Sequence, residues 1–103
     1  GERRAQDLDG MELWERIFEH DRFGAQHRRR FQGDTSLDGG DHSLAVIRLL
    51  NCLALWTGSD ATRMRQMMLM APLANDKWLL KRRASDWLEY QIEDAIRYVI
   101  NKL

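Results

Sequence analysis

The chain has 103 residues, of which 44% are hydrophobic and 31% are charged, and its 16 basic side chains are balanced by 16 acidic ones. This composition is that of a folded globular domain and excludes a disordered chain. No run of 18 apolar residues occurs, so we predict neither a membrane span nor a signal peptide. A neutral chain is also unlike a dedicated high-affinity binder of duplex DNA, because such domains carry a basic excess.

The length predicts one domain, which we place at residues 9–103 after a linker or cloning remnant at residues 1–8. The chain begins with Gly1 rather than methionine, and we expect it to be a piece of a longer protein. The single cysteine, Cys52, lies in an apolar segment and has no partner for an internal disulfide. This cysteine usage fits a reducing, intracellular setting.

A capping-box pattern predicts the first helix. The Asp9 side chain can accept from the free backbone amides of the first turn, while Glu12 reaches back. The apolar face of this helix is expected to hold Met11, Leu13, Trp14, Ile17 and Phe18. A second helix is predicted over residues 22–31, and Gly33 is placed to end it.

Glycine and aspartate interrupt the helical pattern in the middle of the chain. Residues 33–41 hold three glycines and three aspartates and should form a loop. A third helix is predicted from Asp41 or His42 to Thr57, with Gly58 as its left-handed cap. This helix is apolar on nearly every face, so we expect it to be central and buried.

Two further helices complete the pattern. Ser59 or Asp60 should cap the fourth helix, which Pro72 ends because proline lacks a backbone donor. We interpret its methionines as adaptable core filling, namely Met64, Met67, Met68 and Met70. The last helix should start at Ser85 or Asp86. No alternating strand pattern occurs, so the predicted fold class is all-α, a compact bundle of about five helices.

The sequence patterns of catalytic and metal sites are missing. The chain has no phosphate-binding loop, no nucleophile elbow and no acidic pair within a strand that would hold two metal ions. His20, His27 and His42 do not have the spacing of zinc ligands, and the loop aspartates lack the final glutamate of a calcium loop. We therefore predict no metal site and no catalysis by this chain on its own.

Several short motifs follow one another in a fixed order along most of the chain. They are Arg30-Phe31-Gln32-Gly33-Asp34-Thr35-Ser36, Leu53-Ala54-Leu55-Trp56-Thr57-Gly58-Ser59-Asp60, Arg63-Met64, Pro72-Leu73, Lys77-Trp78 and Gln91-Ile92-Glu93-Asp94-Ala95-Ile96. With this order and spacing, the chain from about Glu12 to Ile100 resembles the helix-bundle domain that follows the catalytic core in phage and plasmid primase-polymerases.

The resemblance implies an accessory role in DNA replication, in which the domain engages the single-stranded DNA template and the initiating nucleotide during primer synthesis. It implies a primase-polymerase core or a helicase domain of the same polypeptide as partner, and a cytoplasmic location in a bacterial, archaeal or phage-infected cell. It implies no cofactor in this domain, with ATP or another nucleoside triphosphate as ligand.

Two basic patches are the candidate contacts to the template. Residues 22–33 hold four arginines and no acid, and residues 77–83 hold four basic side chains and no acid. Consecutive arginines on a helix point about 100° apart, so at least two of the three at positions 28–30 should reach solvent. The candidate nucleic-acid-binding residues are Arg28, Arg29, Arg30, Lys77, Trp78, Lys81, Arg82 and Arg83.

The tryptophans have different expected roles. Trp14 and Trp56 fall on apolar helical faces and are predicted to lie in the core. Trp78 has two interpretations: it clamps the bundle against an irregular segment, or it forms a surface platform on which a base stacks.

A second class of function stays open, a non-catalytic docking or spacer bundle within a larger replication protein. Its surface would be the acidic first helix or the methionine-rich helix, and its association would be insensitive to salt. A helix-turn-helix reader of duplex DNA is weaker, because its recognition helix would offer only Arg63, Arg65 and Gln66. A further hypothesis is that the loop at 33–41 is mobile and closes over the template.

Overall fold

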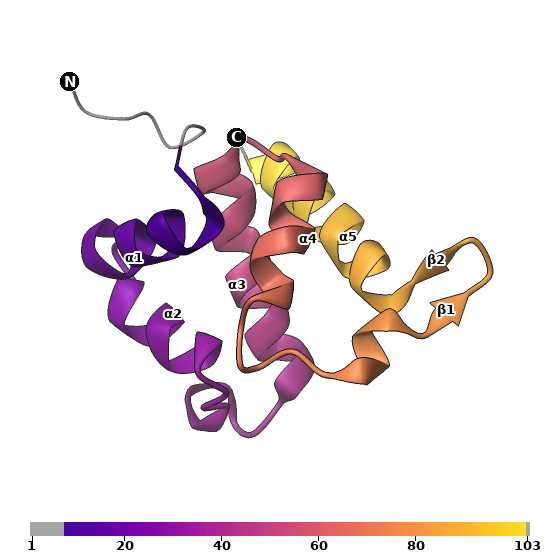
Figure 1. Ribbon diagram of the computed structural model, residues 1–103, viewed down its shortest axis with the longest axis horizontal. Helices are drawn as coiled ribbons and strands as arrows, with labels where there is room; N and C mark the ends of the chain where they lie inside the picture. Colours follow the sequence, from indigo (N-terminus) through magenta and orange to yellow (C-terminus); the bar gives the residue numbers. More distant parts are fainter. Residues whose placement is uncertain (1–7, 103) are drawn as a thin grey trace.

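The computed structural model describes residues 8–102, and this part of the chain contains five α-helices, two short 3-10 helices and a small hairpin (Figure 1). The elements are α1 (Gly10–His20), α2 (Gly24–Phe31), η2 (Ser36–Asp38), α3 (His42–Thr57), α4 (Ala61–Leu69), η3 (Asp76–Leu79), β1 (Lys81–Arg82), β2 (Ser85–Asp86) and α5 (Trp87–Lys102). The predicted all-α bundle of about five helices is confirmed.

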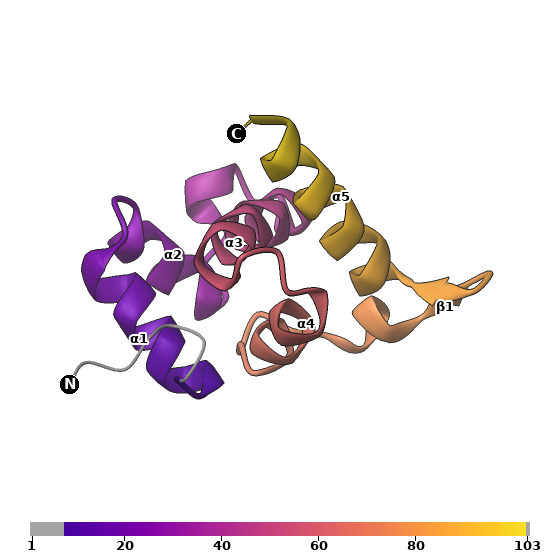
Figure 2. The ribbon, with the colours of Figure 1, turned by 90° about the horizontal axis from the view of Figure 1, so that it is seen from above.

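Helix α3 is the centre of the bundle. It packs against α2, α4 and α5, while α1 packs against α2 and α4 (Figures 1 and 2). The molecule measures 44 Å along its longest axis. Both views place α1 and α2 at one end of this axis and the hairpin at the other. None of the helices within residues 8–102 is both long and apolar enough to cross a membrane.

Aspartate caps begin four of the five α-helices of the described residues, as the sequence predicts, and α2 is the exception. Asp9 accepts a hydrogen bond from the Glu12 amide at 2.8 Å, and Asp41 accepts one from the Leu44 amide at 3.0 Å. The corresponding caps of α4 and α5 are Asp60 and Asp86, which accept from the amides three residues later. Gly58 ends α3 in the left-handed conformation, with φ of 66°.

Helix α2 begins at Gly24, two residues later than predicted. The Asp21 side chain accepts from the Phe23 amide at 2.8 Å, and this turn occupies the residues that we assigned to the start of the helix. Gly24 is buried where α1 and α2 approach closely, and a Cβ atom there would overlap the carbonyl oxygens of Ile17 and Phe18. The sharp connection between the two helices therefore depends on glycine.

The core confirms most of the predicted interior. Trp14 is fully buried and donates from its indole nitrogen to the Met67 carbonyl at 2.9 Å, and Trp56 is half-buried against the core. The expectation was wrong for Met11 and Met70, which are 41% and 44% exposed. Met70 follows the end of α4 and lies at the surface beside Gly10, the first residue of α1.

The structure differs from two predictions, the end of the linker at residue 8 and the absence of strands. Leu8, which we assigned to the preceding linker, is buried with the core, whereas residues 1–7 lie outside the described residues. The absence of strands was also wrong, because Lys81 and Arg82 pair antiparallel with Asp86 and Ser85. Strands of two residues are too short to produce an alternating pattern, so the sequence carries no signal for them.

Candidate nucleic-acid interface

The hairpin end of the molecule displays a cluster of exposed basic side chains. Lys81, Arg82 and Arg83 are exposed on the hairpin, and Lys77 is exposed on the neighbouring η3. None of these four side chains forms an ion pair with another residue of the described range 8–102. Their charges are therefore free to meet a polyanion.

The base of the hairpin is fixed to two helices. Arg65 of α4 donates to both carboxylate oxygens of Asp86, with N–O distances of 3.0 and 2.6 Å. These hydrogen bonds from Arg65 hold the pKa of Asp86 below its usual value, despite the opposing effect of burial. Asp86 also caps α5 through the Glu89 amide at 2.9 Å, and Tyr90 donates to the Arg82 carbonyl at 2.9 Å. Hydrogen bonds from Arg65 and Tyr90 thus anchor the base of the hairpin that carries the basic tip.

A pocket of about 280 Å³ lies beside the hairpin. It is lined by His42, Ser43, Asn75, Lys77, Trp78, Leu80, Arg82 and Trp87. The Trp87 ring is half-buried in this wall, 6.1 Å from the ring of Trp78. Next to it, Leu79 and Leu80 are 46% and 62% exposed. A partly exposed ring among cations is the combination that binds single-stranded nucleic acids.

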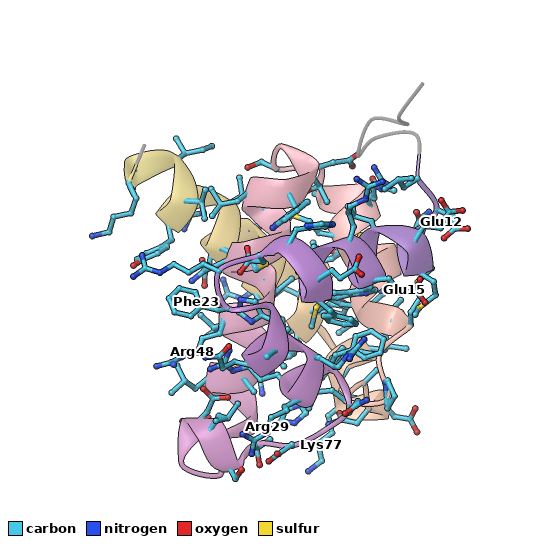
Figure 3. All side chains as sticks on the ribbon, turned by 90° about the vertical axis from the view of Figure 1, so that its left-hand side faces the viewer. Glu12, Glu15, Phe23, Arg29, Arg48 and Lys77 are labelled. Atoms are coloured by element: carbon cyan, nitrogen blue, oxygen red, sulfur yellow. The ribbon has the colours of Figure 1, made fainter. Side chains whose placement is uncertain are left out.

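The arginines of α2 lie at the opposite end of the molecule, which faces the viewer in Figure 3. Arg28 is exposed, with its guanidinium 5.5 Å from the centre of the Phe18 ring. Arg29 is bound by Asp34 at 2.8 Å and also donates to the Ser36 hydroxyl at 3.3 Å. Hydrogen bonds from Ser36 and Arg29 lower the pKa of Asp34 to about 2. One of these two exposed arginines is therefore already paired.

Arg30 lies inside the protein. Its side chain is 6% exposed and forms an ion pair with the fully buried carboxylate of Asp38 at 2.9 Å. Arg48 of α3 approaches the same carboxylate at 3.4 Å. These contacts tie the loop at 33–41 to α2 and α3, so they do not favour the hypothesis that this loop closes over a template.

The expectation that at least two of the three consecutive arginines reach solvent is confirmed by Arg28 and Arg29. Arg30 and Trp78, which the sequence placed among the candidate contacts, offer no surface to a nucleic acid. Arg30 is turned inward by Asp38, and Trp78 is 1% exposed and donates to His42 at 2.9 Å. For Trp78, the structure therefore favours the interpretation as a clamp.

The helix-turn-helix alternative loses its candidate contacts. The Arg63 guanidinium donates to the Leu8 carbonyl, and Arg65 is bound by Asp86. Gln66 is then the exposed member of the set. The sequence could not reveal these two interactions, because Arg63 and Leu8 are 55 residues apart and Arg65 and Asp86 are 21 residues apart.

Comparison with known protein families matches residues 42–102 to a family described as the NrS-1 polymerase HBD domain. The match begins with the first residue of α3 and ends with the last residue of α5, so it includes the hairpin and its pocket. Helices α1 and α2 lie before it. No curated protein and no solved structure matches the chain.

Proposed function

The chain belongs to the family of NrS-1 polymerase HBD domains, and we propose that this helical bundle engages the single-stranded DNA template during primer synthesis. A helical bundle domain of this kind is an accessory part of a primase-polymerase. In our proposal the catalytic steps come from a primase-polymerase core, with or without a helicase domain, in the same polypeptide. The bundle holds the template beside that core.

The observation that carries this proposal is the set of unpaired cations at the hairpin. Lys77, Lys81, Arg82 and Arg83 are exposed and form no ion pair within the described part of the chain. Two of them, Lys77 and Arg82, line the pocket that holds the half-buried ring of Trp87. Three to four phosphate contacts give a salt dependence of log K with a slope of about −2 to −3 for a single strand. Stacking of a base on Trp87 would add roughly 1–3 kcal/mol.

The backbone at the hairpin tip gives independent support. Arg83 has φ of 64°, a left-handed conformation in which a non-glycine residue costs roughly 1–2 kcal/mol. Hairpin turns commonly place glycine at such a position. An arginine retained at a strained tip suggests that the side chain has a function, since local strain is typical of binding sites.

We also propose that the pocket beside the hairpin takes part of a nucleoside triphosphate such as ATP. Its volume of about 280 Å³ lies just below the usual range for small-molecule sites, so it fits a base or a phosphate group better than a whole nucleotide. Lys77 and Arg82 would meet the phosphates. The rest of the nucleotide would lie against the catalytic core.

The test is fluorescence anisotropy of a labelled single-stranded oligonucleotide, measured at several salt concentrations with and without ATP. The chain is compared with a variant carrying Lys81→Gln, Arg82→Gln and Arg83→Gln. A matched control carries Arg22→Gln, Arg97→Gln and Lys102→Gln, which removes the same charge from exposed positions away from the hairpin. We expect the hairpin variant to lose most of the affinity and most of the salt slope, and the control to keep both.

Equal losses in the two triple variants would contradict a hairpin interface and would indicate a general charge effect. No binding at low salt would contradict template engagement itself. A change in DNA affinity on adding ATP that requires Lys77 and Arg82 would support the nucleotide proposal, whereas ATP without effect would count against it.

A second candidate function is a docking bundle within a larger replication protein. A groove of about 530 Å³ between α3 and α5 favours it, because Leu44, Ile47 and Tyr98 line it and Ile47 and Tyr98 are 38% and 53% exposed. Docking through this groove would be insensitive to salt and would be weakened by Ile47→Glu. Binding of the oligonucleotide would not respond to that change.

A further inference from the structure

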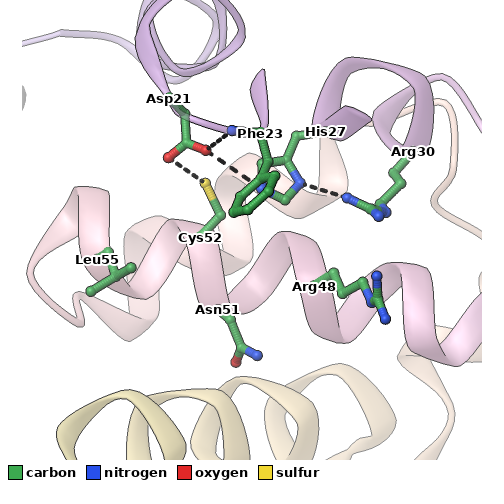
Figure 4. A pocket seen from close by; sticks show the side chains of 8 residues that line it. All are labelled: Asp21, Phe23, His27, Arg30, Arg48, Asn51, Cys52 and Leu55. Carbon is green, nitrogen blue, oxygen red and sulfur yellow. Dashed lines mark hydrogen bonds and ion pairs between the residues drawn. The ribbon is translucent and has the colours of Figure 1, made fainter. Parts of the chain in front are cut away.

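Three elements bring together side chains that bind metals. Asp21 follows α1, His27 lies on α2 and Cys52 lies on α3 (Figure 4). One candidate ligand atom from each of the three lies within 4.8 Å of the other two. The Asp21 carboxylate is 3.7 Å from the Cys52 sulfur and 3.8 Å from His27 Nε2. No local sequence pattern marks this cluster, because Cys52 is 31 residues from Asp21.

We propose that Asp21, His27 and Cys52 bind a zinc ion, or another divalent transition metal of similar chemistry, between the α1–α2 turn and α3. Zinc takes sulfur at about 2.3 Å and nitrogen or oxygen at about 2.0 Å in a tetrahedron, which places ligand atoms roughly 3.2–3.6 Å apart. The observed separations of 3.7 and 3.8 Å are longer than these values and end on different oxygens of Asp21, and the three ligand atoms lie within 4.8 Å of one another. Small side-chain movements would complete the geometry.

The carboxylate is already oriented for this task. Asp21 accepts strong hydrogen bonds from the Trp56 indole at 2.9 Å and from the Phe23 amide at 2.8 Å, one on each oxygen. Each oxygen keeps a second lone pair. The Cys52 thiol donates a long hydrogen bond of 3.7 Å to one oxygen and the imidazole Nε2 lies 3.8 Å from the other, so both contacts are weak. Asp21 is thus held by outer partners while its inner lone pairs face Cys52 and His27, as in metal sites whose ligands are fixed by a second layer of contacts.

The charges also balance. A carboxylate and a thiolate neutralise a divalent cation, and neutral imidazole adds none. Burial raises the pKa of the Cys52 thiol, so in the metal-free protein Cys52 carries a proton. Metal binding releases that proton to solvent as the sulfur–metal bond forms. One divalent cation enters as one proton leaves, so the charge of the site changes from that of the Asp21 carboxylate alone to neutral, and no uncompensated charge is buried.

The surroundings of His27 limit the expected affinity. Nδ1 of His27 is 3.1 Å from Nη1 of Arg30, which can only donate, so the imidazole proton of the metal-free protein lies on Nε2. A metal at Nε2 moves this proton to Nδ1, where the N–H would point at the Arg30 guanidinium, so Arg30 has to withdraw. Ordinary metal sites present an acceptor to that second nitrogen. We therefore expect micromolar rather than nanomolar binding.

The fourth coordination position faces solvent. The three ligands lie in a pocket of about 320 Å³ that is also lined by Phe23, Arg30, Arg48, Asn51 and Leu55 (Figure 4). Three protein ligands with an open fourth position leave room for a water molecule. Asp21 and His27 precede the residues matched by the family, so the proposed site is a property of this chain that the family match does not describe.

The test is a titration of the chelator-treated 103-residue chain with Co²⁺, followed by competition with Zn²⁺. Cobalt bound to a thiolate produces a charge-transfer absorption in the near ultraviolet, so the unmodified chain reports cysteine ligation directly. We expect one Co²⁺ per chain, displaced by Zn²⁺, and a melting temperature that rises with Zn²⁺ concentration.

The variants are Cys52→Ala and His27→Gln, with His20→Gln as the control, because His20 is an exposed histidine outside the cluster. Affinity should fall by more than about 100-fold in the first two, since outer partners alone change metal affinity by 10–100-fold. The control should be unchanged. Absence of the thiolate band in the unmodified chain would overturn the proposal whether or not the variants fold. Equal Zn²⁺ affinity in a folded Cys52→Ala variant would do the same.

Discussion

The two ends of this molecule carry similar runs of positive charge, but they differ in whether carboxylates pair with those charges. At the α2 end, Arg29 and Arg30 are paired with Asp34 and Asp38 of the following loop, and Arg30 is buried. At the hairpin end, the nearby carboxylate Asp86 is taken by an arginine from α4. The hairpin's own cations are left without ion pairs within residues 8–102. A charge run therefore becomes a candidate binding surface only where its potential counterions are engaged elsewhere.

The cations of the two ends also differ in how much they contribute to the stability of the fold. Arg29 and Arg30 fasten the glycine-rich loop onto α2 and Arg48 fastens it onto α3, so these arginines stabilise the fold. The hairpin cations lie on β1 and on the two-residue turn that follows it, and the base of the hairpin is held by Arg65 and Tyr90. Their removal should therefore change binding more than folding, and the following substitutions test this contrast.

The largest effect is expected for Arg30→Met. Removing one partner of a buried ion pair typically costs about 3–5 kcal/mol, and Arg48 at 3.4 Å should keep this loss near the lower value. Urea unfolding would measure it, with Arg28→Met as the matched exposed control. Arg28 loses at most its contact with the Phe18 ring, about 1 kcal/mol. Equal losses would show that burial does not distinguish the two positions.

A somewhat smaller loss is expected for Asp86→Asn, roughly 2 kcal/mol, because hydrogen bonds to charged groups contribute about 1.5–3 kcal/mol. The pKa of Asp86 is lowered in the folded protein. Its contribution is then fully present above the unfolded pKa of about 4 and is lost as the pH falls through the lower folded value. The stability gap between the two proteins, measured by unfolding at pH 7 and pH 3, should narrow at pH 3. A constant gap would contradict the ionic origin.

Arg83→Gly separates charge from structure at the hairpin tip. Glycine tolerates the φ of 64°, so stability should be unchanged or higher by up to about 1 kcal/mol. Affinity for a single strand should fall a few-fold, and the salt slope should lose about 0.7 for one phosphate contact. Ala84→Gly, which leaves the charge in place, is the control for added flexibility. Loss of affinity in both variants would assign the effect to the turn rather than to the arginine.

The smallest effect is expected for Arg28→Gln, which removes the α2 arginine that is exposed and has no carboxylate partner among the described residues. Because the proposed interface lies at the other end of the long axis, oligonucleotide affinity should change by less than about twofold, within the effect of one phosphate contact. A loss as large as that of Arg83→Gly in the same anisotropy assay would show that the template reaches both ends.

Much of the fold could be predicted because its signals are local. The Asp9, Asp41 and Asp60 caps, the left-handed Gly58 and the apolar faces of the helices all act within one or two turns of the chain. The hairpin escaped prediction because its strands are too short to show a period. The exposed Met11 and Met70 escaped because periodicity shows which face of a helix is apolar, but not where the neighbouring helices end.

The candidate site was predicted only in part, for a related physical reason. Composition located both basic patches, and the 100° spacing of consecutive residues on a helix correctly indicated that two of the three arginines are exposed. Neither pattern could show that Arg30 would turn toward Asp38, because the burial of the Asp38 carboxylate also depends on its contact with Arg48 of α3. Nor could the sequence distinguish the two interpretations of Trp78, because the interpretation as a clamp depends on the hydrogen bond of 2.9 Å from its indole nitrogen to His42.

The sequence by itself determined the helical class, the starts of the four helices that aspartates cap and the family to which this chain belongs, because each of these depends on residue order within short segments. The tertiary structure alone decided which charges are free. It also decided that Asp21, His27 and Cys52 meet, since Cys52 is 31 residues from Asp21 and only the packing of α3 against α2 brings them together. Contacts between distant segments depend on packing, and local sequence patterns carry no direct signal for them.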